Sequence, residues 1–70
     1  MDTLLLEYKL KSKGIDTARL LKEMGWSEGT RQTRCIRGEN WRLDEAKTLL
    51  SLGFTWAELG QIFLGKDYQV

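Results

Sequence analysis

The fold of this chain is decided by residues 17–38, whose sequence is TARLLKEMGWSEGTRQTRCIRG. An apolar, helix-forming stretch ends at Gly25, and a second, more polar stretch begins at Ser27. Glycine adopts the left-handed conformation that ends many helices, and serine is favoured just before a helix begins. The stretch therefore predicts two helices, at about 17–24 and 28–37, joined by a tight turn.

The same type of helix end is expected elsewhere in the chain. Gly14, Gly25 and Gly53 each follow a helix-forming stretch and precede a hydrophobic residue. In a Schellman motif, the residue after the glycine contacts the residue four positions before the glycine. We therefore expect contacts between Ile15 and Leu10, between Trp26 and Leu21, and between Phe54 and Leu49.

Polar capping residues indicate where the helices begin. The expected helices are at 3–13, 17–24, 28–37, 43–52 and 56–64. The expected caps are Asp2 or Thr3 for the first helix, Asp16 for the second, and Ser27 or Thr30 for the third. Thr55 caps the last helix and forms a capping box with Glu58. No stretch alternates as a strand would. The sequence predicts an all-α domain over residues 1–65, a compact bundle of about five short helices, followed by a short tail at 66–70.

Apolar residues at helical spacing supply the expected core. They are Leu6 and Leu10; Leu20, Leu21 and Met24; Ala46, Leu49 and Leu50; and Leu59, Ile62 and Phe63. The helix at 28–37 differs, because Ile36 is its only strong hydrophobe. On a helical wheel Gly29, Gln32 and Thr33 share the side of Ile36, whereas Thr30, Arg31, Arg34 and Arg37 lie on or toward the opposite side. If Ile36 faces the core, the arginines face solvent and are free to contact a partner.

Composition excludes several classes of function. The 70 residues include no histidine and one cysteine, so the commonest general base is missing and neither an intramolecular disulfide nor a cysteine-based zinc site can form. So short a chain also leaves little material for a deep catalytic pocket. No run approaches the roughly 18 apolar residues of a membrane span, and residues 1–10 lack the pattern of a signal peptide. We expect a soluble protein without enzymatic activity, metal, cofactor, small-molecule substrate or membrane partner.

Charge is concentrated in the middle of the chain. The formal net charge is +1, but residues 27–42 hold four Lys/Arg against two Asp/Glu, and all four cations are arginine. The guanidinium group of arginine is a planar fork that fits both phosphates and guanine edges. This distribution points to nucleic acid as a partner.

Two helices joined by a Gly-containing turn, with a third helix completing the core, form a helix-turn-helix. The sequence resembles the Cro and CI repressor-type (XRE-like, lambda-repressor-like) domains, especially the short single-domain proteins of temperate phages. The resemblance covers about residues 4–64 and is carried by residues 17–27, 33–38, Trp41, Glu45, 52–54 and 58–63. The stretch from Ser27 to Gly38 is one residue longer than is usual in that family, which leaves the register of the helix at 28–37 open.

The resemblance implies a transcriptional regulator that binds double-stranded DNA in a sequence-specific way, in the cytoplasm of a bacterial host and associated with its nucleoid. The helix at 28–37 would enter the major groove. The DNA-binding residues that we expect are Ser27, Glu28, Thr30, Arg31, Gln32, Arg34, Arg37 and Arg42. Of these, Arg31 and Arg34 would read bases, while Arg37 and Arg42 would hold phosphates.

Other chemistry-bearing residues have plainer interpretations. Trp26, Trp41 and Trp56 are expected to pack against the core rather than to stack on bases. Cys35 is expected to be a small, partly buried side chain, and Asp44 and Glu45 are expected to cap a helix or to face solvent.

One expected partner is a second copy of the chain. Residues 62–64 together with Tyr68 and Val70 carry more hydrophobic surface than one helix face buries. The C-terminal part is therefore a candidate for contact with a second copy in a homodimer on DNA. Equally, the tail could fold back on its own domain.

The low net charge and the acidic residues 43–70 favour an alternative function, a protein-interaction module such as an antirepressor or adaptor on the same scaffold.

Overall fold

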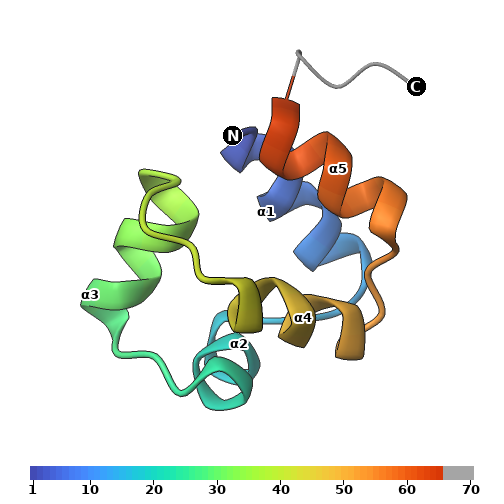
Figure 1. The fold of residues 1–70 in the computed structure, drawn as a ribbon. Helices are drawn as coiled ribbons and strands as arrows, with labels where there is room; N and C mark the ends of the chain where they lie inside the picture. Colours follow the sequence, from blue (N-terminus) through green and yellow to red (C-terminus); the bar gives the residue numbers. More distant parts are fainter. Residues whose placement is uncertain (66–70) are drawn as a thin grey trace.

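The computed structural model describes residues 1–65, which fold into an all-α bundle (Figure 1). Its elements are α1 (Thr3–Ser12), α2 (Thr17–Met24), α3 (Glu28–Arg31), the π-helical turn η1 (Gln32–Ile36), α4 (Leu43–Ser51) and α5 (Trp56–Leu64). The predicted fold class is confirmed, and the helix bounds agree with the expected ones to within a residue or two. None of the described helices is both long and apolar enough to cross a membrane.

Side-chain caps begin four of the helices. Asp2, Asp16, Ser27 and Thr55 each accept a hydrogen bond from the backbone N–H three residues later. Asp2 rather than Thr3 caps α1, and Ser27 rather than Thr30 caps α3. The capping box of α5 is confirmed, because the Glu58 carboxylate accepts in turn from the Thr55 N–H at 2.9 Å.

All three predicted Schellman ends are present. The N–H groups of Ile15, Trp26 and Phe54 donate to the carbonyls of Leu10, Leu21 and Leu49 at 2.9, 3.0 and 3.1 Å. The glycine before each of them has a positive φ, which a residue with a Cβ rarely adopts. Three of the connections between helices are thus set by local sequence.

The buried core contains most of the predicted residues. It comprises Leu6, Leu10, Ile15, Leu20, Leu49, Phe54, Leu59 and Ile62. The other predicted members, Leu21, Met24, Ala46, Leu50 and Phe63, are half-buried at its edge.

Helices α1 and α5 lie side by side, with α4 crossing below them and α2 packed against α4 (Figure 1). Two ion pairs connect α1 and the residue that follows it to α5. Lys9 Nζ and Lys13 Nζ lie 3.1 and 3.0 Å from the Glu58 carboxylate. Helix α3 stands at the edge of the bundle, away from α5 (Figure 1).

The hydrophobic residues at 62–64 are partly buried and partly exposed, as expected. Ile62 is fully buried in the core and Phe63 is half-buried, so only Leu64 is exposed. Tyr68 and Val70, the other residues of that prediction, lie outside the described residues.

Candidate nucleic-acid interface

The predicted pair of helices forms around a tight turn. Gly25 adopts the left-handed conformation at the end of α2, and Ser27 caps α3 two residues later. The side chain of Ser27 also lies 3.1 Å from the hydroxyl of Thr30. The short turn fixes the direction in which α3 leaves α2.

The second part of the expected helix at 28–37 is a π-helical turn. The Arg37 N–H donates to the Gln32 carbonyl, five residues earlier, at 3.0 Å. A π turn holds one more residue than an α turn, so it accepts an insertion without changing the faces of the helix on either side. The register of residues 32–37, which the sequence left open, is that of a π turn.

The predicted orientation of the helix at 28–37 is wrong. Ile36 is 59% exposed, whereas the side chains of Arg34 and Arg31 are only 15% and 21% exposed. The helical wheel correctly separated Ile36 and Gln32 from Arg31 and Arg34, but Ile36 and Gln32 face solvent while Arg31 and Arg34 face the bundle. Arg37, which was grouped with Arg31 and Arg34, is exposed. The cause of the inward orientation is a charged partner for Arg34 inside the bundle.

That partner is Glu45 in the first turn of α4, which is only 8% exposed. Its carboxylate accepts from Arg34 Nε at 2.9 Å, from Trp26 Nε1 at 2.8 Å and from the Arg42 N–H at 2.9 Å. Burial raises the pKa of Glu45, but these hydrogen bonds outweigh burial and hold the pKa below its ordinary value. The ionised carboxylate thus ties the α2–α3 turn, η1 and α4 together.

Aromatic packing surrounds this carboxylate. Trp26 and Trp41 meet edge to face with 5.3 Å between ring centroids, and Trp41 meets Phe63 in the same way at 5.0 Å. Trp41 Nε1 also donates to the Arg34 carbonyl at 2.7 Å. Packing of Trp26 and Trp41 was expected, but Trp56 is 68% exposed at the start of α5, so its predicted packing is wrong.

Arg31, the last residue of α3, is held by an ion pair with Glu28. Its Nε lies 2.9 Å from Oε2 of Glu28, and these bonds lower the pKa of Glu28. One turn later, Cys35 is half-buried as predicted, and burial raises the pKa of its thiol to about 11, so the thiol is protonated at neutral pH.

Arg37 and Arg42 are exposed, as the sequence predicted. Arg37 donates to the Thr33 hydroxyl at 2.8 Å and lies 3.8 Å from Glu39, while Arg42 lies 3.4 Å from Asp44. Exposed ion pairs of this kind are worth roughly 0 to 1 kcal/mol, so a phosphate can readily replace the carboxylate.

The outward surface of α3 and η1 therefore differs from the predicted one. We define the outer face as Gly29, Gln32, Ile36 and Arg37, all of which are exposed, together with half-buried Thr33. Sequence reasoning missed the role of Glu45. Its position was a signal, because Glu45 is the third residue of α4, where a glutamate often accepts a hydrogen bond from the N–H of the capping residue, here Arg42. Residues 1–65 contain no cluster of three or more His, Cys, Asp or Glu side chains that could hold a metal ion.

A comparison of the chain with protein-family models, with curated proteins and with solved structures gives no match.

Proposed function

We propose that this protein binds double-stranded DNA in a sequence-specific way, as a non-catalytic transcriptional regulator of the phage repressor or Cro type. The observation that carries the proposal is the outer face. It is a small surface with polar side chains and one exposed isoleucine, Ile36, on the second helix of a helix–turn–helix pair at the edge of the bundle. A helix presented in this way fits the major groove, and its side chains reach base edges.

Gln32 is the best candidate for reading a base. Its amide is exposed at the centre of the outer face, and glutamine pairs with both the N6 and N7 positions of adenine. Ser27 and Glu28 lie on the same helix, one turn earlier. Ile36 would contact a thymine methyl group.

Phosphate contacts would come from Arg37 and Arg42, which are exposed at the end of η1 and in the following loop. Arg34 changes role relative to the sequence prediction, because its ion pair with Glu45 commits its guanidinium to holding η1 against α4. Arg31 likewise faces the bundle and is paired with Glu28.

The protein would bind its operator as a homodimer. One domain of this size covers one half-site, and two-fold proteins match palindromic operators with half-sites about one helical turn apart. Sedimentation of the protein with and without an operator duplex, obtained by selection from a random-duplex pool, measures how many protein chains bind one operator.

The function is tested by anisotropy with labelled random duplex at low and moderate salt, followed by selection from a random-duplex pool. We expect weak, strongly salt-dependent binding to the random duplex and enrichment of one sequence. Gln32→Ala should lose about 1 to 3 kcal/mol on that sequence and relax one base position. Arg37→Ala should instead weaken binding to all duplexes equally and lower the salt slope by about one. No binding to any duplex at low salt would refute the proposal.

The exposure of Ile36 favours a second candidate, a protein-interaction module. An isolated apolar side chain at 59% exposure on the outer face suits a protein partner as well as a thymine methyl group. This alternative takes the lead if no duplex binds and if Ile36→Ala abolishes a pairwise interaction with a regulator.

A further inference from the structure

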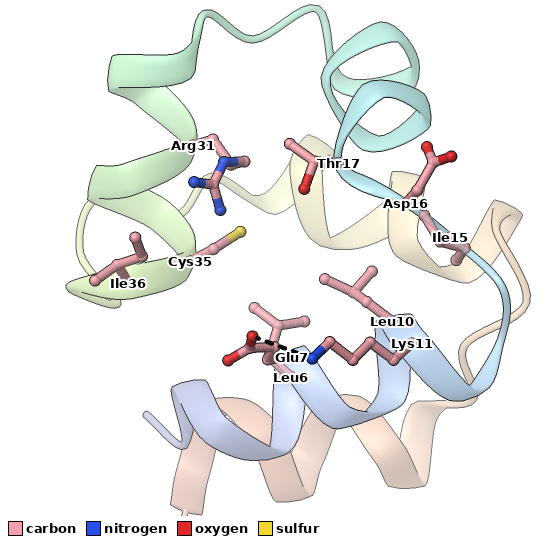
Figure 2. Close-up of a pocket in the computed structure, with 10 residues that line it drawn as sticks. All are labelled: Leu6, Glu7, Leu10, Lys11, Ile15, Asp16, Thr17, Arg31, Cys35 and Ile36. Carbon is pink, nitrogen blue, oxygen red and sulfur yellow. Dashed lines mark ion pairs between the residues drawn. The ribbon is translucent and has the colours of Figure 1, made fainter.

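A cavity of about 490 Å³ separates α1 from α3 and η1 (Figure 2). Its volume lies in the range of small-molecule sites, roughly 300 to 1,000 Å³. Ile36 of the outer face also lines this cavity, but the other lining residues lie outside the outer face, so the proposed function leaves the cavity unexplained.

The cavity exists because the side chains on the inward side of α3 and η1 are too small, or engaged elsewhere, to fill the space. Arg31 and Cys35 occupy the positions that face Leu6 and Leu10 of α1, as Figure 2 shows. A long charged side chain paired with Glu28 and a small thiol do not fill the space that two aliphatic side chains would. The gap is therefore a consequence of the sequence. Leu6, Leu10 and Ile15 in its lining are buried, whereas Glu7, Lys11 and Ile36 are exposed.

The lining is apolar on one side, and its charged groups are Arg31 and Lys11 together with the carboxylates of Glu7 and Asp16. Leu6, Leu10 and Ile15 are core residues, and the protonated thiol of Cys35 adds a neutral surface. Arg31 enters the cavity from the helix above (Figure 2). Its hydrogen bonds within residues 1–65 use Nε and Nη2 only, so the Nη1 end of the guanidinium is open to a second acceptor.

The other charged residues of the lining are Glu7, Lys11 and Asp16. Lys11 and Glu7 form an exposed pair 3.8 Å apart, which lets Lys11 turn toward a new anion. The Asp16 carboxylate is engaged at the start of α2, where it accepts from the Arg19 N–H at 2.8 Å. Two cations and an apolar floor are thus available to one ligand.

We propose that this cavity binds a small amphipathic carboxylate, with its hydrocarbon body on Leu6, Leu10 and Ile15 and its carboxylate on Arg31 and Lys11. A charge-assisted hydrogen bond to a guanidinium is stronger than a neutral one, and the apolar lining supplies the burial that a hydrocarbon chain needs. The proposed site shares Ile36 with the outer face, but binding of a carboxylate there does not depend on DNA binding.

The test is a titration of the full chain with octanoate, followed by methyl signals in ¹H–¹³C NMR. We expect saturable shifts at Leu6, Leu10 and Ile15, while exposed Leu43 and Leu64 do not shift. Octylammonium and 1-octanol, which have the same chain, should bind at least tenfold more weakly. Octanoate without saturable shifts, or equal binding of octylammonium, would overturn the proposal.

Two variants assign the carboxylate contact. Arg31→Gln should weaken octanoate binding at least tenfold, whereas Arg42→Gln, which removes an exposed arginine outside the cavity, should leave it unchanged. Circular dichroism establishes that both variants are folded. Equal affinities for octanoate in the two variants would remove Arg31 from the site; if Arg31→Gln does not fold, the shift map of the unmodified chain and the comparison with octylammonium decide the matter alone.

Discussion

The indole Nε1 of Trp26 donates to Oε2 of Glu45 at 2.8 Å, so the residue that follows the α2 helix end is tied to the first turn of α4. Trp26 is held on its other side by the Schellman hydrogen bond to Leu21. The turn of the helix pair is therefore fixed both by its own glycine and by a carboxylate from a distant part of the chain.

Glu45→Gln should lower the free energy of unfolding by about 2 to 4 kcal/mol, because Arg34 loses its charged partner inside the bundle. Urea titration followed by circular dichroism measures the change. The matched control is Asp44→Asn, one residue earlier, whose side chain is exposed. Equal stability of the two variants would show that the Arg34–Glu45 pair does not hold η1.

Leu49→Ala should cost about 2 to 5 kcal/mol, because a fully buried side chain is lost and leaves a cavity. A domain this small could unfold outright. In the same helix, Leu43→Ala removes an exposed leucine and should cost little. Thermal melting of the pair checks the burial pattern of α4, and similar melting temperatures would contradict it.

Acid should destabilise the contact between α1 and α5. Hydrogen bonds from the Thr55 N–H, Lys13 and Lys9 lower the pKa of Glu58 from 4.5 to about 2. The stabilisation is fully present above pH 4.5 and is lost as pH falls toward 2, since the unfolded state binds the proton first. Glu58→Gln should therefore flatten the decline of unfolding free energy between those pH values. Glu23→Gln, at an exposed position of α2, should keep the slope of the parent chain.

Deleting Thr33 should leave a folded protein within about 1 kcal/mol of the parent, because the π turn becomes an α turn and both flanking faces are kept. Deleting Thr48 from the regular helix α4 should unfold the chain, since the residues after the deletion rotate by about 100° and Leu49 leaves the core. Urea titrations of the two deletions provide the comparison. Unfolding by the Thr33 deletion would show that η1 is not an absorbed insertion.

Local sequence was sufficient to predict the helices and their ends. The caps Asp16 and Thr55 and the glycine ends at Gly25 and Gly53 act over a few residues, so short-range chemistry determines them. Apolar spacing identified most of the core for the same reason.

The orientation of α3 and η1 could not be read in this way. Ile36 was assigned to the core because it is the strongest hydrophobe of its helix, but Arg34 is drawn inward by Glu45, eleven residues away in sequence. Formation of the buried Arg34–Glu45 ion pair outweighed burial of Ile36 in setting the orientation. Such a pair cannot be predicted from a local sequence pattern. Trp56 shows the opposite error, since large aromatic residues are buried only where a neighbouring element covers them.

The backbone N–H of Asp2 donates to the carbonyl of Ile62 at 2.7 Å, and this bond joins the start of α1 to the last turn of α5. Closing a loop of nearly the whole described chain costs more entropy than docking neighbouring helices. The α2–α3 turn and the α2–α4 contact involve much shorter loops, so we expect them to form early, within the fast regime of locally connected helical proteins. The junction between α1 and α5 should close late, which makes it the step that renders folding of the domain cooperative.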